Sequence, residues 1–534
     1  MNQEEADPLG KRFSPSGVTA RSVHRRLTLS SASNVSRFVI SLGVTFFLTP
    51  FIVRTLGDAA YGFWVVLLAF VGYAGILELG VQPAVVKLVG QYQGRNDRAK
   101  LEELVTAAFV FFTAVGFLAS LFVAVILPPL IPRLVREFHG FVGLRILLVI
   151  VAGDVMILFL NYLFAGILYG WQLYHAKNLV DITAWLIHAA LLVVFLLRGG
   201  LVFLAASKTA TDLAALIATI VLCKCTLPKI QPAFRRISWK SFQELLGFGG
   251  RLFVSATSAR VSSYAQPLII SSQLSATATA FFAIPVRLVD YAKQIPWALS
   301  AGFMPMFSEL DSRREVAFLR SIYLRYSRYI LILTLPILVL VFVYGRRFIG
   351  IWIGPEYAER GHVALYMLTA AALLEGLQPL LWRLFIGVGR LNLLVAVSAA
   401  ASLLAVILSF LLVASMGIAG VALGVLVTVA AAQCVFFWYS CRYLEISPGV
   451  LFREIQGRPV LISLVHFGLT IVIARFLGAN SYKAILAGTV LSLLAYLPLV
   501  LIALLPAERR KLGDVIRSAV FRRRKVAVGS DRGT

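Results

Sequence analysis

Long apolar runs separated by short polar connections fill the chain from residue 34 to residue 506. A helix needs about 20 predominantly apolar residues to cross the hydrocarbon core of a bilayer. By that measure the pattern predicts an all-α polytopic membrane protein with about 14 transmembrane helices. The predicted spans are 34–54, 60–86, 103–128, 142–168, 178–197, 200–226, 246–272, 278–305, 322–345, 361–386, 392–413, 417–440, 459–477 and 484–506.

Two polar, basic stretches divide this series of spans, at 227–245 and at 441–458. Each follows six predicted spans, so the sequence predicts two pseudo-symmetric six-helix lobes and two extra C-terminal helices. Paired helical repeats around an inner cavity recur in transporters. The predicted parts are a disordered basic cytoplasmic tail (1–33), an N-lobe (34–226), a cytoplasmic linker (227–245), a C-lobe (246–440), a loop with helices 13 and 14 (441–506) and a second basic cytoplasmic tail (507–534).

The composition excludes a water-soluble protein, because 59% of the residues are hydrophobic and only 14% are charged. The net charge of +25 is typical of nucleic-acid-binding proteins or of the cytoplasmic face of a membrane. The apolar background favours the membrane, and no nucleic-acid partner is expected. On the predicted topology, 31 Lys and Arg residues lie on the side of the termini and 9 on the opposite side. This asymmetry predicts a multi-pass protein of the inner (cytoplasmic) cell membrane with both termini in the cytoplasm.

Sequence signatures of catalysis are missing. The four cysteines do not combine with histidines at zinc-binding spacing, and the chain has no G-x-x-x-x-G-K-[ST] motif for ATP. The longest predicted external connections, 129–141 and 346–360, are too short for a catalytic domain, and Asp58 with Glu356 makes no convincing acidic pair. We therefore expect no cofactor, no metal and no enzymatic activity.

Ionisable residues inside the predicted spans are the most informative class, because charges in a bilayer are costly and face a cavity or a partner. Arg260 lies about 20 Å from the cytoplasmic end of its span and Arg287 about 13 Å from the external end of the next. Two such cations suit a phosphate or pyrophosphate group, which arginine binds through paired hydrogen bonds. The candidates for a substrate-binding cavity are Arg260, Arg287, Lys293, Arg37 and Arg383.

Acidic residues in the spans point to ion coupling or to ion pairs. Arg287 and Asp290, and Asp290 and Lys293, share an i, i+3 spacing, so a structural ion-pair network is as well supported as substrate contact. Arg37 lies near the cytoplasmic end of its span, where a long side chain can reach the interface. The candidates for coupling or ion pairing are Glu78, Asp154, Asp290 and Glu375.

Prolines lie in or beside several predicted spans, where they kink a helix by removing a backbone hydrogen bond. Pro285 and Pro296, in one span, are the candidates for hinges. The alternative is that they have no special role, since membrane helices contain proline often.

Residues 48–97 carry a recognisable series of motifs. They read Pro50, Arg54-Thr-Leu-Gly57, Tyr61-Gly62-Phe-Trp64, Glu78-Leu-Gly80 and Gln91-Tyr-Gln-Gly-Arg-Asn-Asp97. In the second half, Leu246-Gly-Phe-Gly249, Met304-Pro305, Gly387-Val-Gly-Arg390 and Gly417-Ile-Ala-Gly420 follow in a similar order. Over about residues 34–440 the chain resembles the Wzx-type polysaccharide flippases, whose superfamily also holds multidrug and toxin extruders and lipid II flippases.

The resemblance implies a two-lobed bundle that works by alternating access on a polyprenyl-diphosphate-linked glycan. It also implies membrane lipids, and other polysaccharide-assembly membrane proteins, as partners. Many Wzx-type members have twelve spans and lipid II flippases have fourteen, so a lipid II-type flippase stays an alternative. A cation-coupled multidrug exporter of the same superfamily is a second alternative, and an integral glycosyltransferase or polymerase is a third.

Overall fold

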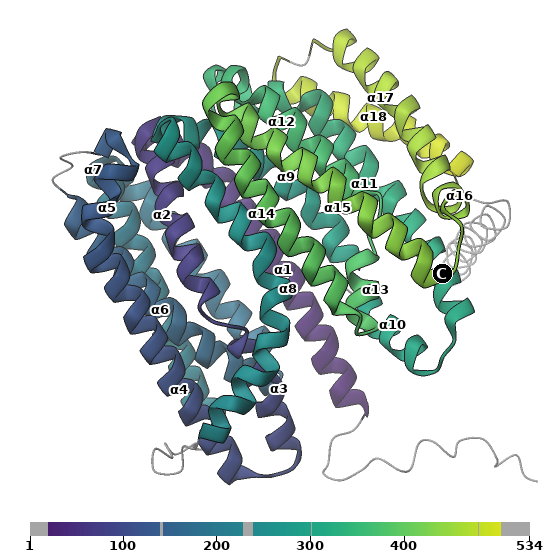
Figure 1. Cartoon of the computed structure of the whole chain (residues 1–534). Helices are drawn as coiled ribbons and strands as arrows, with labels where there is room; N and C mark the ends of the chain where they lie inside the picture. Colours follow the sequence, from purple (N-terminus) through teal and green to yellow (C-terminus); the bar gives the residue numbers. More distant parts are fainter. Residues whose placement is uncertain (1–19, 139–142, 228–238, 301, 479, 504–534) are drawn as a thin grey trace, which may run out of the picture. The chain divides into compact units, whose positions relative to one another are not determined.

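In the computed structural model, the chain is described over residues 20–138, 143–227, 239–300, 302–478 and 480–503. Throughout these ranges the regular structure is helical, with no β-strand (Figure 1). The fold class predicted from the hydrophobic pattern is therefore confirmed. The C-terminal tail predicted at 507–534 and most of the linker predicted at 227–245 lie outside the described residues.

The chain forms two compact units, one of residues 1–57 and 70–256 and the other of residues 58–69 and 257–534. Long helices dominate the first unit, with a π-helical turn between α4 and α5. Its helices are α1 (Ala20–Leu56), α3 (Val81–Gly94), α4 (Arg98–Leu121), η1 (Phe122–Ile126), α5 (Leu127–Leu134), η2 (Arg136–Phe138), α6 (Leu144–Gly170) and α7 (Tyr174–Thr226).

The second unit takes the first part of α2 (Asp58–Ile76) and the later part of α8 (Trp239–Gln273). Arg328 in α11 donates to the Glu454 carbonyl at 3.0 Å and Tyr496 in α18 donates to the Ile332 carbonyl at 2.9 Å, so both contacts tie the last helices to α11. The remaining helices are α9 (Ala276–Ser300), α10 (Phe303–Ser312), α11 (Val316–Trp352), α12 (Pro355–Gly376), α13 (Leu381–Gly387), α14 (Leu391–Met416), α15 (Ile418–Leu444), α16 (Pro448–Leu451), η4 (Phe452–Gly457), α17 (Arg458–Phe476) and α18 (Tyr482–Ala503).

Within the described residues, eleven helices are long and apolar enough to cross a membrane, or up to twelve if the bent pair α12 and α13 is one span. They account for every predicted span except 246–272 and 278–305. Those two stretches are helical as α8 and α9, but neither is among the helices that are long and apolar enough to be counted as a span. In α9, the charged residues Arg287, Asp290 and Lys293 all lie within one membrane-crossing length. The count of fourteen spans stays a prediction.

Three stretches differ in detail from the predicted boundaries. The segment 20–33, expected in a disordered tail, belongs to α1; it contains no Gly or Pro to stop a helix. The predicted span 60–86 is broken, because Leu79 and Gly80 have left-handed backbone angles between α2 and α3. The predicted span 361–386 bends by 46° between α12 and α13.

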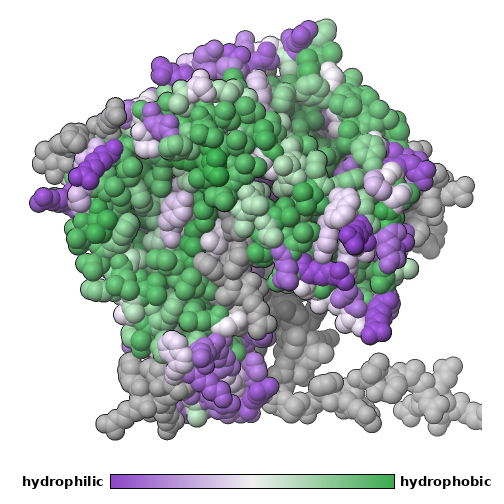
Figure 2. All heavy atoms as spheres, viewed as in Figure 1, coloured by the Kyte–Doolittle hydropathy of each residue, from purple (hydrophilic) through white to green (hydrophobic). Residues whose placement is uncertain are grey.

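The exterior of the helices is apolar over wide areas. Hydrophobic side chains cover most of the visible helix flanks, and polar side chains gather near helix ends (Figure 2). Large residues of α17 and α18 are strongly exposed, among them Leu461, Phe476 and Leu486. Surfaces of this extent face lipid, because a soluble protein exposes far smaller apolar patches.

Candidate translocation site

The Tyr61-Gly62 motif lies at a tight contact of α2 with α9 in the second unit. A Cβ atom on Gly62 would stand 1.7 Å from the Ala276 carbonyl oxygen, so only glycine lets the two backbones approach this closely. Nearby, the Tyr357 hydroxyl of α12 donates a 2.6 Å hydrogen bond to Asp58 at the start of α2. These contacts fix the first half of α2 against α9 and α12.

The α9 cations find partners on other helices. The Arg287 guanidinium lies 5.9 Å from the centre of the buried Tyr61 ring, within range of a cation–π interaction. Lys293 does not turn along α9 toward Asp290 but reaches α12, where its ammonium lies 2.6 Å from Glu375. Asp290 itself is exposed. The α9 charges thus contact groups on other helices in addition to the i, i+3 neighbours along α9 that the spacing suggested.

Arg260 and Arg383 differ sharply in their surroundings. Arg260 on α8 is exposed and has no ion-pair partner among the residues that the structure describes. Arg383 on α13 donates from Nε to the Ser300 hydroxyl and from Nη2 to the Trp297 carbonyl, both at 3.3 Å, and lies 4.2 Å from the Trp297 ring centre. Arg383 is therefore largely engaged with the end of α9, whereas Arg260 is available to a ligand.

In the first unit, Arg37 and Glu78 both have local partners. Arg37 lies 3.6 Å from Asp181 of α7 and 5.9 Å from the centre of the Trp185 ring. Glu78 accepts a 3.2 Å hydrogen bond from the backbone N–H of Gln82, at the first turn of α3. The acidic-Leu-Gly motif thus has a structural use, since Glu78 caps the helix that restarts after the break.

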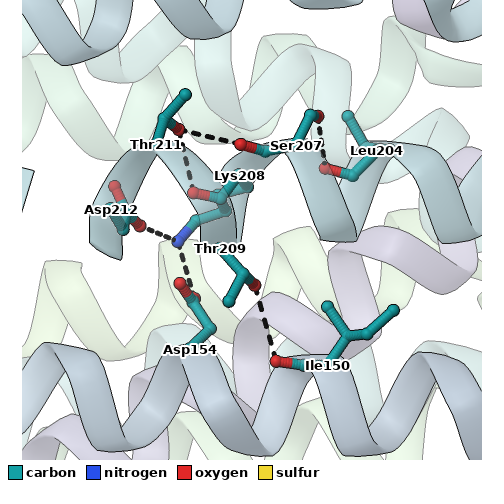
Figure 3. A network of polar contacts seen from close by, with 8 residues as sticks. All are labelled: Ile150, Asp154, Leu204, Ser207, Lys208, Thr209, Thr211 and Asp212. Carbon is teal, nitrogen blue, oxygen red and sulfur yellow. Dashed lines mark hydrogen bonds and ion pairs between the residues drawn. The ribbon is translucent and has the colours of Figure 1, made fainter. Parts of the chain in front are cut away.

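Asp154 lies in a network that the sequence analysis identified only in part (Figure 3). The Lys208 ammonium stands between two carboxylates, 2.6 Å from Asp154 of α6 and 2.6 Å from Asp212 of its own helix. Thr209 adds a 3.4 Å hydrogen bond to the Ile150 carbonyl of α6. Sequence reasoning missed Lys208 and Asp212, although a charged i, i+4 pair inside the apolar run 200–226 was a signal for them.

The two candidate hinge prolines lie inside one continuous helix, α9. Pro285 is buried, and a Cβ on Gly361 of α12 would lie 3.0 Å from its ring. Pro285 therefore takes part in close α9–α12 packing. A hinge role for Pro285 and Pro296 stays a prediction.

Over the described ranges, helices with apolar, lipid-facing flanks and charged residues within them are the features of a polytopic membrane transporter. The sequence profile of the family described as "Polysaccharide biosynthesis protein" matches residues 51–360. The chain belongs to this family.

Relatives of known description support the same grouping. The chain is 24% identical over 309 residues to the "Putative O-antigen transporter" of Shigella flexneri, covering 58% of this chain and 72% of that protein. It is 20% identical over 307 residues to the "Probable low-salt glycan biosynthesis flippase Agl15" of Haloferax volcanii, covering 57% of this chain and 64% of that protein.

Solved structures show the same fold. The lipid II flippase MurJ in an inward closed conformation aligns with a TM-score of 0.67 at 15% identity, over 89% of this chain and 98% of its own. An inward-facing multidrug resistance transporter of the MATE family aligns with a TM-score of 0.62 at 15% identity, over 77% and 94%. The resemblance deduced from the motifs is confirmed at the level of fold and family.

Proposed function

We propose that this protein is a flippase that moves a polyprenyl-diphosphate-linked oligosaccharide from the cytoplasmic to the outer leaflet by alternating access, for cell-surface polysaccharide biosynthesis. The observation that carries the proposal is the family match over residues 51–360, joined by relatives described as an O-antigen transporter and a glycan flippase. The protein acts in the inner cell membrane, with both termini in the cytoplasm.

The charge chemistry of the second unit suits such a cargo. Two helices of this unit, α8 and α9, carry Arg260 and Arg287 within the stretches 246–272 and 278–305 that the hydrophobic pattern predicts to cross the membrane. A diphosphate is an anion with many acceptor oxygens, and arginine is the side chain best suited to bind it. We propose Arg260 as the principal contact, because its guanidinium is exposed.

A cation-coupled multidrug exporter would place acidic groups in the cavity. Among the acidic candidates, Glu78, Asp154 and Glu375 already have partners on the protein, which supports the flippase over the exporter. The glycosyltransferase alternative requires a free external carboxylate, and Asp58 accepts the Tyr357 hydrogen bond instead. We infer that the protein translocates its cargo without a chemical step.

Reconstitution tests this function directly. Purified protein in liposomes would receive a labelled polyprenyl-diphosphate oligosaccharide, and exposure of the inner-leaflet sugar to an external sugar-modifying enzyme would be followed over time. A charge-assisted hydrogen bond contributes about 1.5–3 kcal/mol, so Arg260→Ala should slow translocation at limiting substrate by more than about tenfold. Arg313→Ala, which removes an exposed helix-surface pair with Glu309, is the matched control and should leave the rate unchanged.

The alternatives give different results in the same preparation. Ion-driven efflux of an organic cation without sugar translocation would replace the flippase with the exporter. Acceptance of a lipid-linked peptidoglycan unit in preference to other glycans would favour a lipid II-type flippase. Release or extension of the sugar would establish an enzyme.

A further inference from the structure

Two helices of the first unit, α1 and α7, bring a group of charges together at one end of their spans. Lys177 of α7 pairs with Asp181, which lies one helical turn further along the same helix. The Arg37 guanidinium of α1 lies 3.6 Å from the same carboxylate. The Lys177 side chain is 2% exposed, that of Asp181 16% and that of Arg37 39%. The buried ammonium therefore neutralises Asp181, and the positive charge of Arg37 is in excess near the surface.

Among the described helices that pack against α7, no second acidic side chain compensates this excess charge. Those helices are α1 and α6. The described part of α1 contains no Asp or Glu. The remaining acids of α6 and α7 both lie beside Lys208 and pair with it. With two cations and one carboxylate, the group of Arg37, Lys177 and Asp181 has a net positive charge.

Arg37 is held in place without its hydrogen-bonding capacity being used. Its distance from Asp181 is longer than a hydrogen bond. The guanidinium also lies 5.9 Å from the centre of the Trp185 ring, within range of a cation–π interaction. Within the described ranges, no group accepts a hydrogen bond from Arg37. A guanidinium offers five N–H donors in one plane, a geometry that matches a phosphate group.

The position of Arg37 along its helix is that of a membrane–water interface. Arg37 is the second residue of the apolar span Ser36–Leu56, and the neighbouring span of α7 begins at Tyr174. The rings of Tyr174 and Tyr169 stack at the same end, with their centres 4.6 Å apart. Tyrosine and tryptophan gather at the interface of a bilayer, and a long arginine side chain reaches toward it. Lipid phosphates lie at this level.

Deeper in the membrane, α1 and α7 present apolar side chains on their exposed faces. Val39 and Phe47 of α1 are exposed, as are Leu186 and Val193 of α7. The two spans that contain them are the least buried of the candidate spans in the described residues. Acyl chains can therefore lie along the same helices that hold Arg37.

We propose that Arg37 binds the phosphate of an anionic phospholipid, in the leaflet on the side where α1 enters the membrane. The guanidinium donates hydrogen bonds to the phosphate oxygens, and the acyl chains lie along α1 and α7. Anionic lipids concentrate next to basic residues at the cytoplasmic surface. The site does not depend on the transport function proposed above.

The charge balance favours a phospholipid over the phosphate of the cargo. A phospholipid with one negative charge neutralises the single excess cation, whereas a lipid diphosphate has a further negative charge that this group leaves uncompensated. Arg37, which the sequence suggested for the cargo cavity, thus serves a resident membrane lipid.

Lipid binding to the purified full-length protein tests the proposal. Protein in detergent would be titrated with phosphatidylglycerol or with phosphatidylcholine of the same acyl chains, and bound lipids would be counted by native mass spectrometry. The wild type should retain one phosphatidylglycerol that equimolar phosphatidylcholine does not displace. Arg37→Gln should lower the affinity for that lipid about tenfold. Arg37→Lys should lower it less, because an ammonium keeps the charge without the planar donors. Arg313→Gln, in an exposed surface pair, is the matched control and should bind like the wild type.

Asp181→Asn should have the opposite effect. It leaves two cations without their carboxylate, so the affinity for phosphatidylglycerol should rise severalfold, which the loss of a merely structural pair does not produce. Unfolding temperatures in phosphatidylcholine micelles control for damage to the fold. The proposal is overturned if phosphatidylcholine binds as tightly as phosphatidylglycerol, or if Arg37→Gln retains the lipid. Displacement of phosphatidylglycerol by equimolar polyprenyl diphosphate would also overturn it and would assign Arg37 to the cargo.

Discussion

The charge clusters around Lys208 in the first unit and around Lys293 in the second unit differ in their balance of acidic and basic groups. In the first unit, one cation serves two carboxylates around Lys208, and Asp154, the more buried acid, has an oxygen without a hydrogen-bond partner among the described residues. In the second unit, basic residues outnumber acidic residues along α8 and α9. Lys293 forms an ion pair with one acid, Glu375, and both side chains are about half exposed. An acidic excess does not suit an anion, whereas a basic excess does. The basic excess of the second unit supports the proposal that an anionic cargo binds there.

The sharpest way to break this comparison is to remove the shared cation of the first unit. Lys208→Met leaves two carboxylates facing each other, and breaking a buried pair costs about 3–5 kcal/mol. Because Lys208 is 30% exposed, we expect a loss of about 2–3 kcal/mol. Thermal unfolding in detergent would measure it.

The double variant Lys208→Met with Asp154→Asn is the control, since it removes one of the two stranded charges. It should recover part of the stability that Lys208→Met loses. Equal unfolding temperatures for Lys208→Met and the wild type would show that Lys208 and its two carboxylates are already solvated, which would weaken the contrast between the two clusters.

A charge swap tests the second unit. Lys293 and Glu375 are 41% and 38% exposed, so their coupling should be about 1 kcal/mol or less. Lys293→Glu or Glu375→Lys alone should lower stability slightly, and the double swap should restore it. Cargo binding should stay weak in the double swap, because the cation is then on α12.

Full recovery of cargo binding along with stability in the double swap would contradict this expectation. It would show that the pair only joins α9 to α12. Unfolding temperature and titration with the labelled lipid-linked sugar, measured on the same preparations, separate the two results.

Hydrophobic pattern predicted most of the fold, because bilayer thickness imposes one helix length on every span. The pattern did not predict where helices are interrupted or where the first helix begins. Span 60–86 looked continuous because Leu79 and Gly80 interrupt its backbone without interrupting its apolar character. The predicted tail 1–33 looked disordered because its residues are polar, although 20–33 contains no helix breaker.

The sequence identified several of the charged residues of the candidate site, though not Lys208 or Asp212, and it did not predict which of them lie side by side. Spacing along α9 suggested Asp290 as the partner of Lys293, whereas packing brings Glu375 to it from more than eighty positions away. The Asp154–Lys208 contact joins two helices in the same manner. Contacts between helices depend on which faces pack together, and one sequence does not contain that information.

Arg383 provides a contrast to Arg260 within the second unit, because Arg383 is a basic residue already bound to other side chains and carbonyls of the protein. Arg383→Ala removes two hydrogen bonds and the cation–π contact with Trp297, which together should lower the free energy of unfolding by about 1 kcal/mol at this half-exposed position. Cargo affinity should change by less than about twofold, in contrast to Arg260→Ala, because the hydrogen bonds that Arg383 makes go to the protein and are replaced by bonds to water. A larger loss of affinity than of stability would place Arg383 among the cargo contacts.

The smallest effect is expected at Asp58, the residue that also tests the glycosyltransferase alternative. Asp58→Asn keeps an oxygen that can accept the Tyr357 hydrogen bond, so stability should fall by about 0.5 kcal/mol and translocation by less than about twofold. Tyr357→Phe is the matched control, because it removes the donor and leaves the carboxylate in place. A catalytic carboxylate would behave in the opposite way: Asp58→Asn would abolish activity while Tyr357→Phe preserved it. Which of the two variants loses more activity therefore distinguishes a packing contact at the start of α2 from a reactive group.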